Sequence, residues 1–403
     1  DAGNSQGYSY FRLRGIDQTR INMTLDGVPL NEPEDQGAYF SNYPDILNSV
    51  SKIQIQRGVG TSKNGVASYG GSVQLFSPNL ADSTKTTFGL GYGSFNSLRV
   101  FGEYNSGIKN KKALYVRASQ IYSDGYKYHS SNNSQSVFLS GGLFHYKSIW
   151  KLNFLAGHQQ NDMAWLGVTD SLIDIDRRTN SNSNQEKDRF LQTLTQLKNS
   201  WQIGQFSSLE TSIYHTFLKG NYGFDFNNFI GLSSTDELYN YAFQSNLVGF
   251  FSNYTLSKKQ FNLISGVHGN IYNRQHTGSE KTIGQLYQNT GYKNEISVFT
   301  KVDYSLKWFA FFADVQYRYV NFDYKGSVAL QKLDWHFINP KAGLSATLNN
   351  NYILYYSVGY TGREPTRNDM FGGNDDLLAD SLGNGILSNT NPEFVLNHEL
   401  GYR

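Results

Sequence analysis

The sequence predicts an all-β membrane protein, an antiparallel transmembrane β-barrel. Three observations lead to this prediction. Aromatic residues make up 15% of the 403 residues and charged residues only 17%, whereas charged residues usually approach about 25%. From Lys85 onward, segments of roughly 10 or more residues alternate apolar and polar side chains, as barrel strands do. The connections between them are alternately short and long, which is typical of a barrel with tight turns at one rim and long loops at the other.

The alternating segments account for the barrel part of the chain. The stretches 150–157, 295–304 and 309–319 alternate apolar and polar side chains at most positions, and Leu155 breaks the pattern in the first of them. We expect about 14 such strands after residue 80. A water-soluble β-sandwich would alternate as well, but aromatic residues gather near the strand ends, as they do at the two interfaces of a membrane: Tyr92, Phe95, Tyr146, Trp150, Trp308 and Tyr360.

Two segments alternate poorly. Residues 190–201 and 208–218 place apolar side chains on both faces. We therefore expect the inner faces of these strands to be covered by the N-terminal domain.

The connections are assigned from their polarity and their turn residues. Short turns are expected at 107–111, 146–148, 305–307 and 349–351. Long loops are expected at 158–187, 220–237, 272–291 and 361–393.

Composition excludes several classes of function. The net charge of +2 gives no general attraction to nucleic acid. The sequence has no run of about 18 apolar residues, so no transmembrane helix is predicted. The mean hydropathy of −0.50 is compatible with barrel strands that have one polar face. The chain contains no cysteine, so it has neither disulfides nor thiolate metal sites.

No pattern of catalytic residues is present, so we predict that the protein is not an enzyme and needs no cofactor. The eight histidines are dispersed, and no metal site is predicted from them. Asp375, Asp376 and Asp380 form an acidic group near Asn374. Calcium prefers such oxygen ligands, but the spacing lacks a calcium-loop pattern, and a solvated loop is the favoured interpretation.

The N-terminal region carries four glycine-containing elements in a fixed order: the pair Arg14-Gly15, the turn Asp26-Gly27 followed by Pro29, the pair Arg57-Gly58, and the pair Gly70-Gly71. Asp26-Gly27 lies between apolar segments and predicts a hairpin, since Gly accepts the positive φ that such turns need. We also expect Gly60 and Gly65 to let the backbone of this region bend and pack closely. No phosphate-loop pattern is present. We expect Arg14 and Arg57 to anchor this domain to the barrel wall through ion pairs.

This ordered set resembles the plug domain of TonB-dependent outer-membrane receptors. Three later stretches resemble elements of that family's barrel: 335–344, 355–367 and 391–402. The resemblance implies a small N-terminal α/β plug domain in the lumen of the barrel. It divides the chain into a partial plug at 1–80 and a partial barrel at 81–403. Barrels of this family have 22 strands around a plugged lumen, so the chain is expected to be a piece of a longer receptor that also has a TonB box and further strands.

The resemblance implies a function and partners. It predicts a receptor in the outer membrane of a Gram-negative bacterium, surrounded by outer-membrane lipid. The receptor would import a scarce small-molecule nutrient, most often a ferric siderophore or another iron complex, using energy from TonB with ExbB–ExbD. Two alternatives remain open: a passive, closed fourteen-stranded channel with a plug, and a non-transporting subunit of a larger outer-membrane assembly.

The expected ligand site follows from the same topology. In resembling receptors, the segment after the hairpin, residues 31–43, rises toward the extracellular side. Its mixture of aromatic and hydrogen-bonding side chains suits a small polar-aromatic ligand, although packing against the barrel would explain it equally well. The candidate residues are Glu32, Glu34, Asp35, Gln36, Tyr39, Phe40 and Tyr43 from this segment, and Trp165, Tyr222, Phe224, Arg363 and Arg367 from the barrel. Arg363 and Arg367 are expected either to bind carboxylates of a ferric chelate or to pair with the acidic group at Asp375.

Overall fold

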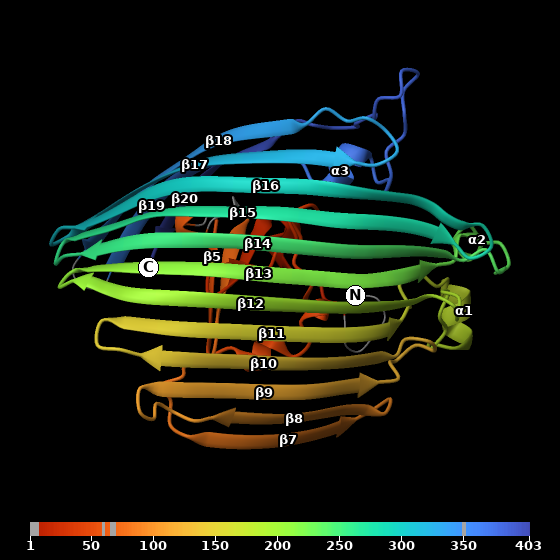
Figure 1. Ribbon diagram of the computed structural model, residues 1–403, viewed down its shortest axis with the longest axis horizontal. Helices are drawn as coiled ribbons and strands as arrows, with labels where there is room; N and C mark the ends of the chain where they lie inside the picture. Colours follow the sequence, from red (N-terminus) through yellow and green to blue (C-terminus); the bar gives the residue numbers. More distant parts are fainter. Residues whose placement is uncertain (1–7, 59–60, 65–69, 349–351) are drawn as a thin grey trace.

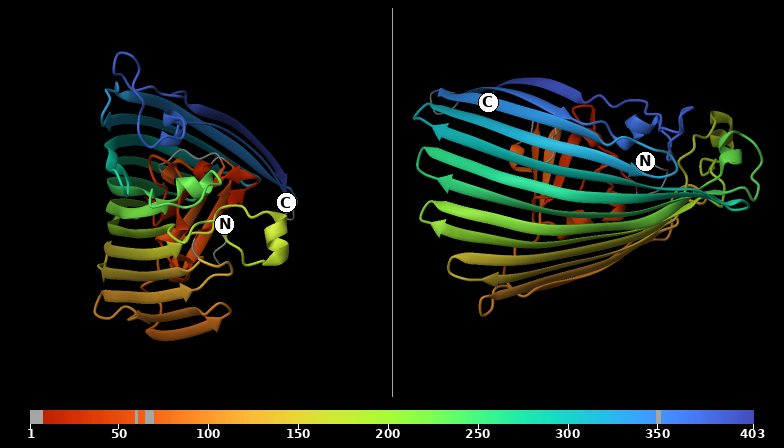
Figure 2. Two further views of the ribbon diagram at one scale, coloured as in Figure 1. Left: turned by 90° about the vertical axis from the view of Figure 1, so that its right-hand side faces the viewer. Right: turned by 45° about the horizontal axis from the view of Figure 1, so that its top comes forward.

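The protein folds into a large curved sheet with a small domain on its concave side (Figures 1 and 2). The computed structural model describes residues 8–58, 61–64, 70–348 and 352–403. Gly60, Gly65 and the expected turn at 349–351 lie outside the described residues.

The large sheet contains fourteen antiparallel strands in sequence order, β7 to β20, as the alternation predicted. The strands are β7 (Lys85–Gly93), β8 (Ser97–Asn105), β9 (Lys112–Ser123), β10 (Asn132–Phe144), β11 (Ser148–Asp162), β12 (Lys187–Gly204), β13 (Ser207–Phe224), β14 (Tyr239–Ser257), β15 (Phe261–Glu280), β16 (Gly284–Ser305), β17 (Phe309–Lys325), β18 (Leu333–Leu348), β19 (Tyr352–Arg363) and β20 (Glu393–Tyr402). Within the described residues β7 and β20 are the two edges and do not pair with each other. The closed fourteen-stranded channel is therefore not the arrangement in the structure.

Long loops and short turns lie at opposite ends of the sheet. The long loops contain α1 (Asp170–Ile175), α2 (Phe226–Phe229) and α3 (Arg367–Phe371), all at one end (Figure 1); this end is called the long-loop end. One expected loop is wrong, because 272–291 is mostly strand and only residues 281–283 connect β15 to β16. Among the described residues, no helix combines the length and the apolar character needed to cross a membrane.

The N-terminal domain is built on a four-stranded sheet in the order β4-β3-β6-β5, with β3 and β6 parallel. Asp26 and Gly27 join β3 to β4 with φ of 49° and 89°, the positive values expected for a two-residue hairpin. A two-stranded ladder, β1-β2, lies apart from this sheet. The elements are β1 (Arg12–Leu13), β2 (Ile16–Asp17), β3 (Ile21–Leu25), β4 (Val28–Pro29), β5 (Lys52–Arg57) and β6 (Gly71–Phe76), with 3-10 turns η1 (Gln18–Arg20), η2 (Phe40–Asn42), η3 (Ile46–Ser49) and η4 (Ser62–Asn64).

Apolar contacts join this domain to the inner face of the large sheet. Leu155, Leu194 and Tyr214 point inward and share one buried cluster with Leu25 and Val28. The prediction that the N-terminal domain covers the poorly alternating strands is confirmed, and Leu155 breaks the alternation for the same reason. An inward apolar side chain is favourable where a domain, and not water, lies against it.

Ion pairs add polar tethers to the same interface. Arg14 lies 3.1 Å from Glu399 of β20, as expected. In contrast to the prediction, Arg57 is exposed and forms no ion pair with any described residue. Asp45 supplies a tether that was not predicted, because its buried carboxylate lies 2.7 Å from Arg117 of β9.

Candidate ligand-binding site

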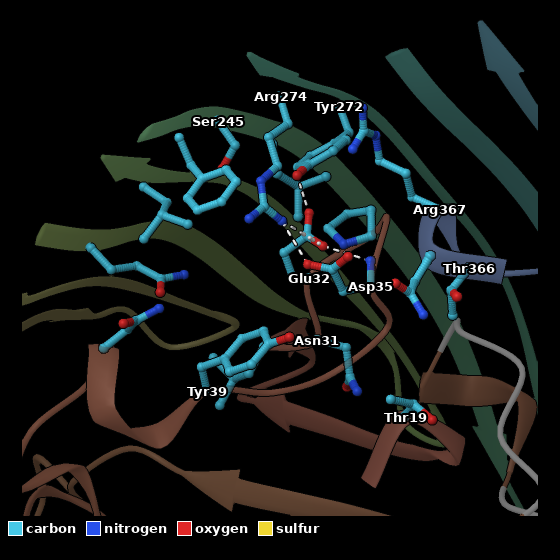
Figure 3. Close-up of a pocket in the computed structure, with 18 of the residues that line it drawn as sticks. Thr19, Asn31, Glu32, Asp35, Tyr39, Ser245, Tyr272, Arg274, Thr366 and Arg367 are labelled. Carbon is cyan, nitrogen blue, oxygen red and sulfur yellow. Dashed lines mark hydrogen bonds and ion pairs between the residues drawn. The ribbon is translucent and has the colours of Figure 1, made fainter. Parts of the chain in front are cut away.

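A cavity of about 560 Å³ lies between the N-terminal domain and the inner face of the sheet, toward the long-loop end. Figure 3 shows its charged centre. The lining comes from the segment after the hairpin, from strands β12 to β15, and from the loop that carries α3. Its members are Tyr8, Thr19, Arg20, Pro29, Leu30, Asn31, Glu32, Pro33, Asp35, Tyr39, Asn42, Tyr43, Phe190, Gln192, Thr216, Leu218, Tyr222, Phe243, Ser245, Leu247, Tyr272, Arg274, His276, Arg363, Thr366, Arg367, Asn368, Asp369, Gly373, Asn374 and Asp375.

Asn31 fixes the start of the segment 31–43. Its Nδ2 donates to the carbonyl oxygens of Ile21 and Gln36, both at 2.9 Å. Its Oδ1 accepts the backbone N–H of Met23 at 2.7 Å. A buried amide with all three of these bonds holds the segment to β3, so the side chains that follow are presented to the cavity from a fixed base.

Glu32 and Asp35 share one arginine of the wall. Arg274 Nη1 lies 3.2 Å from Glu32 Oε2 and 2.8 Å from Asp35 Oδ2, and its guanidinium lies 4.4 Å from the ring centre of Phe243. The Tyr272 hydroxyl donates to Glu32. Burial raises the pKa of Glu32 to about 7. Burial acts in the same sense on Asp35, but the facing Arg274 brings the pKa of Asp35 below its usual value.

Glu34 points away from the cavity into the wall. His276 Nε2 lies 2.8 Å from Glu34 Oε2, and Arg367 Nε lies 3.8 Å from the same oxygen. A Cβ on Gly291 of β16 would come within 1.9 Å of the other oxygen, Oε1. That oxygen has no hydrogen-bond partner among the described residues. Burial raises the pKa of Glu34 to about 7.

Arg363, at the end of β19, bonds to the N-terminal domain and to the next strand. Its Nη1 donates to Gln36 Oε1 and to the Thr19 carbonyl oxygen, both at 2.8 Å. Its Nε lies 3.1 Å from Glu393 Oε2. Arg363 therefore pairs with Glu393 and not with the acidic group at Asp375.

Arg367 begins α3 and does reach that acidic loop. Its Nη2 donates to Asn289 Oδ1 at 2.9 Å and to the Asp375 carbonyl oxygen at 2.7 Å. Its Nη1 lies 3.9 Å from the Asp375 carboxylate. Both arginines are thus largely occupied by the protein's own oxygen atoms.

The structure brings together most of the predicted site residues. Those that line the cavity are Glu32, Asp35, Tyr39, Tyr43, Tyr222, Arg363 and Arg367. Gln36 borders a smaller adjoining cavity, and Glu34 lies behind the wall. Phe40 packs against the apolar core instead. The ring of Trp165 stacks on that of Phe224, the last residue of β13, with 6.0 Å between the ring centres, and neither residue lines the cavity.

The prediction missed the residues that β15 contributes, Tyr272, Arg274 and His276. They fall within the segment assigned to a loop. Their even spacing was the available signal, because residues two apart on a strand share one face. The intervening Asn273 and Gln275 are polar too, so no alternation in hydropathy marked the strand.

The acidic loop is held by hydrogen bonds. Asp376 accepts from Tyr324 at 2.7 Å and from Asn289 at 2.9 Å. Asp380 accepts the backbone N–H groups of Leu382 and Asn384 within its own loop, each at 2.8 Å. In the described part of the chain, no group of three or more histidine or acidic residues is arranged to hold a metal ion.

Two family models match the chain. The TonB-dependent Receptor Plug Domain matches residues 1–72. The TonB dependent receptor-like, beta-barrel model matches residues 140–403. No curated protein sequence matches the chain significantly.

Solved structures share the whole fold at low sequence identity. The copper transporter OprC aligns with a TM-score of 0.80 at 13% identity and covers 100% of this chain and 63% of its own. The unliganded ferric citrate transporter FecA aligns with a TM-score of 0.77 at 13% identity and with the same coverage of the two chains. The siderophore receptor PiuA from Acinetobacter baumannii aligns with a TM-score of 0.74 at 12% identity, and the alignment covers 100% of this chain and 64% of PiuA. The chain thus spans just under two thirds of the length of these structures.

Proposed function

Since the chain belongs to the family of TonB-dependent receptors, we propose that it is the plug and part of the barrel of a receptor in the outer membrane of a Gram-negative bacterium. The receptor binds a scarce small-molecule nutrient and imports it into the periplasm with energy from TonB and ExbB–ExbD. The observation that carries this proposal is the cavity between the plug segment 31–43 and the barrel wall. A ligand there would touch both the part that moves and the part that stays in the membrane.

The lining favours a ferric siderophore or another iron complex of low net charge. Four arginines and four carboxylates line the cavity together with seven tyrosine and phenylalanine rings. Arg274 is paired with Glu32 and Asp35, and Arg363 with Glu393. A strongly anionic chelate would have to displace these carboxylates, whereas a neutral chelate can use the aromatic rings and the hydrogen-bonding groups as they stand.

The test measures binding and transport by the full-length receptor. Purified receptor is titrated with a neutral ferric hydroxamate chelate, an anionic ferric carboxylate chelate and cobalamin, and uptake of the radiolabelled chelate is followed in cells with and without a protonophore. We expect the neutral chelate to bind at least about 10-fold more tightly than the anionic one, since the anion would have to break existing ion pairs. Uptake should stop when the proton gradient is removed.

A variant in which residues 31–43 are replaced by a Gly/Ser stretch locates the site. It should lose chelate binding, yet its barrel should stay resistant to heat in detergent gels. Unchanged affinity in this variant would remove the segment from the site. Failure of all three compounds to bind the wild-type receptor would contradict the proposed ligand class.

A further inference from the structure

A hollow of about 540 Å³ lies on the outer, convex face of the sheet, across strands β11 to β15. These five strands lie side by side in Figure 1. Most of this hollow is formed by outward side chains in two adjacent rows that run across the strands. We call the hollow the outer-face groove. Its polar members include His158, Arg189, Lys219, Asn221, Gln244 and Gln275.

The side chains of the groove point away from the lumen. Phe190 and Leu218 line the inner cavity, so Arg189 and Lys219, one position along the same strands, point outward, because side chains alternate on a strand. Arg189 pairs in register with Asn221, and Leu191 pairs with Lys219. The arginine and the lysine are therefore diagonal neighbours on the outer face.

The groove lies just above an apolar band. On the side toward the short turns, the outward side chains of Ile213, Val248 and Ile271 are exposed to 57%, 48% and 61%. On β12, about 10 residues separate exposed Leu191 from exposed Trp201, the length that a tilted strand needs to cross a bilayer. Arg189 and Lys219 thus lie at the level of the lipid headgroups on the long-loop side.

The two cations of the groove lack carboxylate partners. Lys219 forms no ion pair and no hydrogen bond with any described residue. Arg189 donates one bond from Nη2 to Gln160 Oε1 at 3.0 Å, which leaves most of its guanidinium free. None of the described lining residues is acidic. The nearby outward carboxylate, Asp162, is already 3.3 Å from Lys187.

This contrasts with the inner face. There, Arg274 and Arg318 are each held by two carboxylates. Cations that the protein leaves unpaired, beside amide donors and above an apolar surface, form a site for an anion that carries hydrocarbon.

We propose that the outer-face groove binds a phosphorylated lipid of the outer leaflet. Arg189 and Lys219 bind its phosphate groups, the side chains of Asn221 and Gln244 bind hydroxyl or amide groups of the headgroup, and the acyl chains lie along Val248 and Ile271. The inference rests on the outer-membrane location proposed above, but it requires neither a transported ligand nor TonB.

The test is lipid binding to the full-length receptor, delipidated in a non-ionic detergent and observed by native mass spectrometry. Three probes are compared: diphosphorylated lipid A, the same lipid with both phosphates removed, and inorganic phosphate. The variant Arg189→Gln/Lys219→Gln is measured beside the control Lys325→Gln/Lys332→Gln, which removes two exposed cations outside the groove.

The wild type and the control should bind the diphosphorylated lipid equally well. The groove variant, and the wild type with the dephosphorylated lipid, should bind at least about 10-fold more weakly. Equal affinity of the groove variant, or of the dephosphorylated lipid, would overturn the proposal. Inorganic phosphate binding as tightly as the lipid would show a free-phosphate site and overturn it as well.

Heat resistance in gels verifies that the variants are folded. If the double variant is not, the two single variants replace it, each with a smaller loss expected. Because the assay needs no transport, absence of chelate uptake would contradict the proposed function and leave the lipid result standing.

Discussion

Glu34 is one of the residues through which the cavity-lining segment 31–43 of the plug contacts the barrel wall. Its side chain is fully buried, with His276 on one carboxylate oxygen and the backbone of Gly291 behind the other. Its carbonyl oxygen accepts the backbone N–H of Arg367 at 2.9 Å. The wall leaves no room at this point for a side chain on β16. The position of Glu34 therefore fixes where the segment that carries Glu32 and Asp35 lies along the wall.

The pKa of this group gives a pH-dependent stability. Burial raises the pKa of Glu34 to about 7, above the unfolded value of about 4.3. A carboxyl group shifted in this direction stabilises the fold fully below its unfolded pKa and loses that contribution as the pH rises toward 7. Between pH 5 and pH 8 we expect the wild type to lose more melting temperature than Glu34→Gln, which keeps only the shift of Glu32 in the same direction.

Thermal unfolding followed by tryptophan fluorescence at both pH values measures this effect. Glu237→Gln, which changes an exposed loop carboxyl, is the matched control. A pH difference in Glu34→Gln as large as in the wild type would show that Glu34 does not carry the effect.

At the scale of elements, the strand pattern was predictable only where one face meets lipid. β11 and β17 alternate through the apolar band, and the sequence predicted them. Above that band, residues 273–280 of β15 are polar or glycine on both faces, so this part of the strand lost the alternation and was assigned to a loop. The same loss concealed Arg274 and His276. The segment 31–43, which lines the cavity, was found from the sequence because turn chemistry, not alternation, marks its start.

The tether between Asp45 and the strands β8 and β9 was not predictable, because the partners are far apart in the chain. Asp45 lies 2.7 Å from Arg117 and 2.8 Å from Arg99. Its backbone φ of 61° is one that Asn also accepts readily. Asp45→Asn therefore removes the charge and keeps the backbone, and leaves buried Arg117 with Glu103 as its remaining carboxylate, 3.1 Å away.

We expect Asp45→Asn to weaken the docking of the plug by about 2 kcal/mol. The 403 residues contain no cysteine, so a Ser72→Cys thiol in β6, buried in the plug, can report on opening through its labelling rate. Asp236→Asn, in an exposed pair with Lys281, should change the rate little. Equal labelling in the Asp45 and Asp236 variants would contradict a tethering role.

At the scale of the whole molecule, the barrel wall and the plug differ in how extensively their strands are hydrogen-bonded. The wall consists of strands of nine to 22 residues bonded to their neighbours, in surroundings where unpaired backbone groups are costly. The plug has strands of two to six residues and is held by one apolar cluster and by ion pairs. We therefore expect the plug contacts to be lost more easily than the strand pairing of the wall, as the proposed import past a plug requires.

This difference predicts two separate transitions in urea for the full-length receptor in detergent. Urea solvates peptide and apolar groups, and the plug presents both within an aqueous lumen, so its contacts should be lost first. The five tryptophans of these 403 residues all lie beyond residue 149, so in a receptor that keeps only these five the fluorescence reports on the sheet and its loops. Labelling of the Ser72→Cys thiol reports on the plug. We expect labelling to accelerate at a urea concentration where the tryptophan signal and heat resistance are unchanged. Coincident transitions would mean that plug and wall unfold as one unit, and that the proposed import would require the wall itself to unfold.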